Sequence, residues 1–216
     1  MHGFKTEGIV LKRRNFGEAD RILTVFSKDR GKISILAKGV RRITSRRAGN
    51  VELLNRVSIF LHPTKGMPIL TEAISLDTYS KLKMDLTLST VAFHIIELVD
   101  KLTAEGQESS NLYFNLTKVL EKLEKKPRQI FIRAFEVKIL SLMGFSNFQE
   151  NLDSHLEDVS LNVKDILKSL EVRPWDEIEQ MEVKEKEALE LESVLRYYLE
   201  RVIEGALKSR QFLRKI

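Results

Sequence analysis

The chain has 216 residues, enough to bury a sizeable core in one large domain or two small ones. It contains no cysteine, which excludes disulfides and cysteine-ligated zinc or iron–sulfur sites. Its net charge is +5, but the charge is unevenly distributed. Residues 1–80 hold 15 Lys and Arg against 7 Asp and Glu, whereas residues 81–216 hold 21 against 24. This asymmetry favours two domains, the first of them basic.

No part of the sequence approaches the roughly 18 consecutive apolar residues of a membrane span. The N-terminal segment MHGFKTEGIVLKRR also lacks the apolar stretch of a signal peptide. These features, with the absence of cysteine, predict a soluble cytoplasmic protein.

Alternation of apolar and polar residues predicts five short strands near the N-terminus. They cover residues 4–13, 19–27, 32–38, 51–61 and 69–75. Turn-forming residues separate them, including Gly17, Gly31 and the segment 62–66. Strands of this number and length predict a small closed barrel, and an OB-like barrel is the natural candidate.

A basic segment follows the third predicted strand. It contains five cations and no Asp or Glu: Lys38, Arg41, Arg42, Arg46 and Arg47. A half-buried strand therefore leads into a loop with no local neutralising charge, which is typical of a surface that binds a polyanion such as nucleic acid. The alternative is an ordinary solvated basic surface.

Three further arginines, Arg13, Arg14 and Arg21, are candidates for phosphate contacts from the first two strands. Their alternative role is surface ion pairing with Glu7, Glu18 or Asp20. The aromatic residues Phe4, Phe16, Phe26 and Phe60 lie in the same region. Strand spacing assigns most of these rings to the core. The predicted surface therefore acts mainly through charge.

From residue 77 onward, apolar residues recur at helical spacing. The predicted helices cover residues 86–102, 111–123, 128–143, 163–170, 174–181 and 186–204. The helix 128–143 is apolar almost all round, which predicts the centre of a bundle, and Gly144 is expected to end it in the left-handed conformation. Residues 146–160 are predicted to be a link. The predicted fold class is α+β, with an OB-like barrel over residues 1–76 and an all-helical domain over residues 77–216.

Motifs for catalysis or metal binding are missing from the sequence. The four histidines are far apart, and none lies in a HExxH pattern. His94 lies in the apolar stripe of the helix 86–102 and is interpreted as a core or rim histidine. No Walker loop, GxGxxG or GxSxG motif occurs. We therefore predict a protein that is not an enzyme and has no cofactor.

Four short segments near the N-terminus are distinctive: EGIVL at residues 7–11, GEAD at 17–20, GKIS at 31–34 and AKGVRR at 37–42. They resemble the RecO family of bacterial DNA repair and recombination mediators. Residues 134–136 with 142–145 look like the family's FE…LLxxxGY helix, and residues 207–210 with Leu213 look like its closing KSRxxL segment. Many members carry a four-cysteine zinc module after the central helix. Residues 146–160 of this chain hold no cysteine, so zinc cannot be carried over.

The resemblance implies binding of single- and double-stranded DNA and annealing of complementary strands. It also implies work with RecR and single-stranded DNA-binding protein to load recombinase onto DNA. Two other functions stay open on the residues alone: an adaptor whose barrel docks an acidic protein, and an RNA-binding OB protein.

The resemblance further implies that the helical domain binds the acidic C-terminal tail of single-stranded DNA-binding protein. Arg133 is the candidate charge partner, because it is a cation in an otherwise apolar stretch beside Phe131 and Phe135. The alternative role for Arg133 is an ion pair with Glu136 or Glu97.

Overall fold

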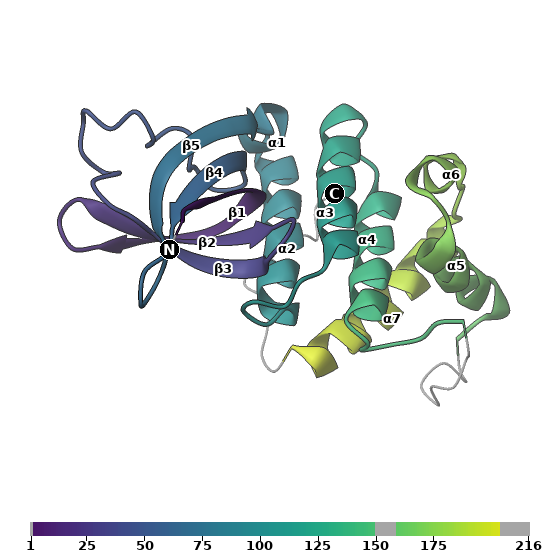
Figure 1. The fold of residues 1–216 in the computed structure, drawn as a ribbon. Helices are drawn as coiled ribbons and strands as arrows, with labels where there is room; N and C mark the ends of the chain where they lie inside the picture. The colour runs from purple at the N-terminus through teal and green to yellow at the C-terminus, as the bar shows by residue number, and fades with distance from the viewer. Residues whose placement is uncertain (1, 150–158, 204–216) are drawn as a thin grey trace. The chain divides into compact units, whose positions relative to one another are not determined.

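The computed structural model describes residues 2–149 and 159–203 (Figure 1). The chain divides into two compact units. The first combines residues 1–84 with residues 99–114, and the second combines residues 85–98 with the chain from residue 115 onward. The KSRxxL segment with Leu213 lies outside the described residues.

The first unit is built on a closed barrel of five strands (Figure 1). These are β1 (Phe4–Phe16), β2 (Asp20–Ser27), β3 (Gly31–Ala37), β4 (Arg56–His62) and β5 (Ile69–Asp77). Neighbours follow the order β1-β2-β3-β5-β4, and β1 pairs with β4 to close the ring. Only the β3–β5 pairing is parallel among these strands. The predicted OB-like barrel is confirmed.

The barrel interior is filled by small and branched apolar side chains, as the alternation in the sequence requires. Leu23 of β2 lies opposite Ile35 of β3, and both are buried inside the barrel. Because successive side chains point to opposite faces, the polar residues between them are directed away from this core.

The predicted strand 51–61 is wrong at its start, because β4 begins only at Arg56. Leu54 has a positive φ of 72°, which no strand residue adopts, and its N–H donates to the carbonyl of Val10 (2.9 Å). The Asn55 amide donates to the carbonyls of Gly49 (3.1 Å) and Asn50 (2.9 Å). This turn buries apolar residues as a strand does, so its composition led to the wrong prediction of a strand.

Residues 99–114 are bonded to the outside of the barrel. The Gly106 N–H donates to the carbonyl of Lys32 (2.8 Å), and the Lys32 ammonium donates to the carbonyl of Asp100 (2.6 Å). Gly31 is required here, because its φ is +61° and a Cβ would meet the Gln107 carbonyl oxygen at 1.9 Å. The Lys32 ammonium is therefore hydrogen-bonded within the first unit.

The helices are α1 (Ser80–Met84), α2 (Leu86–Leu102), α3 (Ser110–Lys125), α4 (Gln129–Leu142), α5 (Leu161–Val172), α6 (Trp175–Gln180) and α7 (Glu185–Val202). In the second unit α4 packs against α5, α6 and α7, which confirms its predicted central place. Gly144 ends α4 with a φ of +74°, and the Phe145 N–H donates to the Leu140 carbonyl (2.9 Å). Within the described ranges, no helix is long and apolar enough to cross a membrane.

Candidate nucleic-acid interface

The connection from β3 to β4 carries the basic segment and is fixed to the barrel at both ends. Val40 and Val51 are fully buried and belong to the apolar cluster inside the barrel. Between them the backbone folds into successive turns, for example where the Ser45 N–H donates to the Arg42 carbonyl (2.9 Å). The Asn50 side-chain oxygen also accepts a hydrogen bond from the Ser75 N–H of β5 (3.2 Å). The segment 41–50 is therefore held as a defined loop.

The start of this loop is bonded to the tip of the β1–β2 hairpin. The Gly39 N–H donates to the Asp20 carboxylate (2.7 Å), and the Arg41 N–H donates to the Ala19 carbonyl (2.8 Å). The Arg41 guanidinium donates in turn to the carbonyl of Gly17 (3.2 Å). The hairpin tip and the loop thus form one continuous surface, although about twenty residues separate them in the chain.

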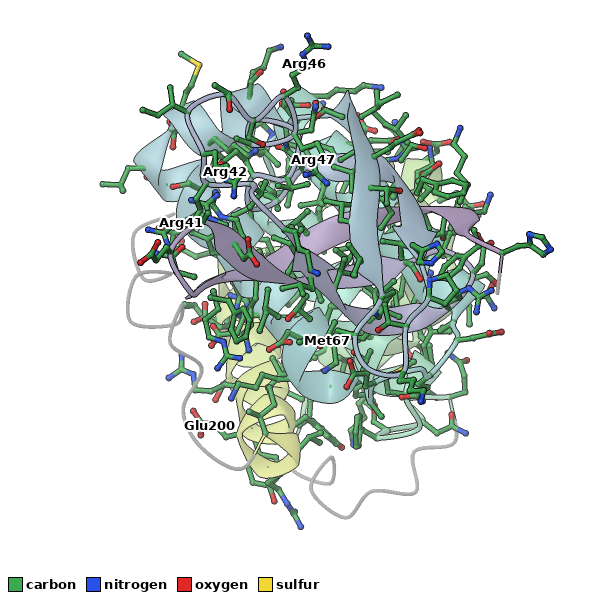
Figure 2. All side chains as sticks on the ribbon, turned by 60° about the vertical axis from the view of Figure 1, so that its left-hand side comes forward. Arg41, Arg42, Arg46, Arg47, Met67 and Glu200 are labelled. Carbon is green, nitrogen blue, oxygen red and sulfur yellow. The ribbon has the colours of Figure 1, made fainter. Side chains whose placement is uncertain are left out.

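Arg47 braces the loop and is only partly exposed. Its guanidinium donates to the carbonyl of Lys38 (2.8 Å) and also to the carbonyls of Leu70 and Thr71 in β5. In Figure 2 Arg47 lies against the strands, whereas Arg46 projects from the outer edge of the loop. Three carbonyl acceptors use most of the donors of one guanidinium. Arg47 shapes the surface more than it presents charge.

Arg13 and Arg21 share the carboxylate of Glu52 rather than any of the acids expected from the sequence. The Arg13 guanidinium forms an ion pair with one oxygen of Glu52, and Arg21 lies 3.5 Å from the other. Arg21 also donates to the Asn15 side chain (3.4 Å). One carboxylate neutralises part of this pair, so their contribution to the surface potential is reduced.

The remaining predicted cations have no such partners. Lys38, Arg14, Arg42 and Arg46 are exposed, and in the described part of the chain no acidic side chain lies within 4.0 Å of their charged nitrogens. They belong to the loop and to the neighbouring hairpin. Figure 2 shows Arg41, Arg42 and Arg46 spread along the loop rather than gathered at one point. Dispersed charges of this kind suit the repeating phosphates of a strand.

Two family models match the sequence. "Recombination protein O N terminal" covers residues 1–79, which include the barrel and the basic loop, and "Recombination protein O C terminal" covers residues 84–147. The chain belongs to the RecO family.

Relatives from three bacteria support this membership, and each carries the name DNA repair protein RecO. The chain is 28% identical to the protein of Desulforamulus reducens over 100% of its own length and 96% of the relative. It is 29% identical to that of Pelotomaculum thermopropionicum over 99% of its length and 94% of the relative. The match to the protein of Acetivibrio thermocellus is 38% identical but spans 68% of this chain and 59% of the relative.

The segment 146–160, where the sequence analysis looked for a zinc module, falls mostly outside the described residues, because residues 150–158 are not among them. Across the described segments, no group of three or more His, Asp or Glu side chains is arranged to hold a metal ion. Independence from metal stays a prediction.

The residues predicted for the tail peptide lie on α4. The rings of Phe131 and Phe135 are fully buried, so they form part of the helical core rather than an open groove. Arg133 is 14% exposed, and its guanidinium pairs with Glu136 (2.9 Å) and Glu192 (3.1 Å). The ion pair with Glu136 that the sequence offered as an alternative is therefore present. The tail-binding role of Arg133 stays a prediction.

Arg133 belongs to a buried cluster of ionisable side chains. The sequence predicted its pair with Glu136 as an alternative but did not predict the contact of Glu136 with His94. The His94 ring nitrogen Nε2 donates to Glu136 Oε1 (2.8 Å), and both side chains are almost fully buried. Burial favours the neutral form of Glu136, but the charge of Arg133 and the hydrogen bond from His94 prevail and hold the pKa of Glu136 at about 2. His94 is a core histidine, as interpreted from its position in the apolar stripe.

Proposed function

We propose that this protein acts in DNA repair and homologous recombination by binding single- and double-stranded DNA through the basic surface of its barrel. On this proposal it anneals complementary strands and helps to load recombinase onto DNA covered by single-stranded DNA-binding protein. RecR and the acidic tail of single-stranded DNA-binding protein are the proposed protein partners. Membership of the RecO family supports the partners, and the barrel surface supports the DNA contact.

The observation that carries the proposal is the set of exposed cations without acidic partners on a braced loop. Each cation that contacts a phosphate releases condensed counterions, so affinity falls as salt rises. Four such contacts on a single strand correspond to a slope of log K against log salt of about −3. Contacts to phosphates leave base edges available for pairing, which is what annealing requires.

The test is a triple variant that removes loop charge and keeps the brace. Lys38, Arg42 and Arg46 are changed to Ala, while Arg47 is retained because its loss would also disturb the loop. We expect weaker binding of single-stranded DNA and a salt slope flatter by about 2, at roughly 0.7 per lost contact. Annealing of complementary oligonucleotides without ATP should slow in parallel.

The matched control removes three other exposed cations of the same unit, Lys5, Lys28 and Lys65. This control lowers the net charge by the same amount as the loop variant. If DNA binds to the loop specifically, the slope of log K against log salt for the control should stay close to that of the wild type. Equal slopes in the wild type and the loop variant would remove the loop from the interface. Parallel titrations with RNA and with an acidic peptide test the two other functions, RNA binding and docking of an acidic protein. Tighter binding of either ligand than of DNA would identify that ligand in place of DNA.

A further inference from the structure

Among the described residues of the five strands, Phe16 is the one aromatic ring that is exposed. Phe16 is 48% exposed, whereas Phe26 is fully buried and Phe4 packs under the guanidinium of Arg30 at 4.0 Å. Phe16 is the last residue of β1, and Gly17 turns the chain with a φ of +56°. In the described residues, no ring or cation–π partner lies against Phe16. The hairpin therefore presents an open aromatic face.

Two cations of the interface lie near Phe16, one on the same strand and one on the loop. Arg14 lies two residues earlier on β1, so it shares the face of Phe16 at a spacing of about 7 Å. The Arg41 guanidinium is held on the carbonyl of Gly17, the residue that follows Phe16 (3.2 Å). A nucleic-acid strand that bound at the ring would therefore meet two cations close by.

The acids near the ring do not cancel this charge. Asp20 lies opposite Phe16 in the hairpin and contributes one negative charge, and its carboxylate accepts the Gly39 N–H (2.7 Å). Glu18 is exposed at the tip and opposes Arg14 and Arg41 with a single charge. The hairpin tip and the loop together, residues 13–21 and 38–47, hold eight Lys and Arg against these two acids, so the surface around the ring is positive. A positive surface favours an anionic ligand over an apolar side chain of a protein.

We propose that the ring of Phe16 stacks on one unpaired base of single-stranded DNA while Arg14 and Arg41 contact the flanking phosphates. This inference rests on the proposed function. Aromatic rings stack on bases of any identity, so the contact adds affinity without sequence preference. Duplex bases are already stacked on one another and cannot use the ring. The ring therefore makes binding of single strands tighter than binding of duplexes, a preference that phosphate contacts alone do not provide. Because only one ring is involved, the other bases stay open for pairing.

The experiment compares Phe16→Ala, Phe16→Leu and Phe16→Trp in the full chain. Affinities for a deoxythymidine oligonucleotide and for a duplex of equal length are measured across salt. We expect a loss of roughly 5- to 150-fold for single strands in the Ala variant, which is the range found for one base–ring stack. The Leu variant should lose most of the same affinity, the Trp variant should keep it, and duplex binding should change little. Ile74→Ala is the matched control, because Ile74 is another exposed apolar residue of the barrel, at 62% exposure.

The outcomes distinguish this inference from the function on which it rests. If the Phe16 variants bind single strands like the wild type while the loop triple variant binds weakly, stacking is overturned and the DNA interface stands. If neither set alters binding, both fail. Equal losses for single strands and duplexes would assign the ring to the shape of the hairpin and overturn stacking. If the Ala variant does not fold, the Leu and Trp variants decide, because both keep an apolar side chain. Tight binding of an apolar peptide that Phe16→Leu preserves would instead indicate a protein partner.

Discussion

Removing Arg133 should destabilise the helical unit far more than removing an ordinary surface arginine. The perturbation is Arg133→Met, which keeps the apolar stem and deletes the guanidinium. The carboxylate of Glu136 is only 2% exposed and pairs with Arg133 and His94 in the wild type. In the variant it stays buried, and of these two partners only His94 remains. Loss of one partner from a buried ion pair costs about 3–5 kcal/mol.

The pKa of Glu136 gives the pH dependence of this stabilisation. Its value of about 2 in the folded protein compares with 4.5 in the unfolded chain, and this difference corresponds to about 3 kcal/mol for Arg133 and His94 acting together against burial. Because the folded pKa is the lower one, the stabilisation is complete above about pH 5 and is lost as the pH falls from 4.5 towards 2. The wild type and the variant should therefore differ most near neutral pH and converge in acid.

The assay is denaturant unfolding followed by helical circular dichroism, with thermal melting as a second measure. We expect the melting temperature of Arg133→Met to fall by roughly 6–20 °C. The control is Arg196→Ala, because Arg196 is 41% exposed and also pairs with Glu192 (3.0 Å), and a surface pair of this kind contributes under about 1 kcal/mol.

A double variant tests the physical cause of the loss. Adding Glu136→Leu to Arg133→Met removes the orphaned charge and should recover part of the lost stability. A single variant as stable as Arg196→Ala, or a double variant less stable than the single one, would refute the role of the buried carboxylate.

Three further predictions concern binding. Protein purified without chelator should contain no stoichiometric zinc and should melt unchanged in EDTA, because the chain has no cysteine; zinc at one equivalent with unfolding in EDTA would contradict this. A labelled tail peptide of single-stranded DNA-binding protein should bind the wild type more tightly than folded Arg133→Met, and equal affinities would remove Arg133 from the peptide site. Arg47→Ala should weaken DNA binding and speed hydrogen exchange over residues 38–50, whereas Arg46→Ala should weaken binding alone; unchanged exchange in Arg47→Ala would refute the brace.

The barrel could be predicted from the sequence because strand alternation and turn residues are local signals. Four of the five predicted strands lie within a few residues of the observed ones, and α2 covers the predicted residues 86–102. The failures also have local causes. The turn at residues 51–55 contains Val51 and Leu54, whose burial gives it the composition of a strand. The helix α1 spans only five residues, which is too short to show a helical period.

The roles of the cations could not be predicted in the same way, because their partners are distant in sequence. Glu52 lies 39 residues from Arg13, and the β5 carbonyls that bind Arg47 lie more than twenty residues away. The sequence shows where positive charge is abundant but not which charge is used internally. The exposure of Phe16 was hidden for a similar reason, since alternation alone assigns a strand ring to one of two faces without saying what covers it.

The internal use of some cations is what makes the others effective. An unbraced loop of this length would have to be ordered when DNA binds, at a cost of about 1–2 kcal/mol for each residue fixed. Val40 and Val51 inside the barrel and Arg47 on the β5 carbonyls fix the loop before any ligand arrives. Lys38, Arg42 and Arg46 can then meet phosphates with only side-chain freedom to lose. The same bracing holds Arg41 at the hairpin tip, so the proposed base contact and the phosphate contacts are positioned by one set of hydrogen bonds.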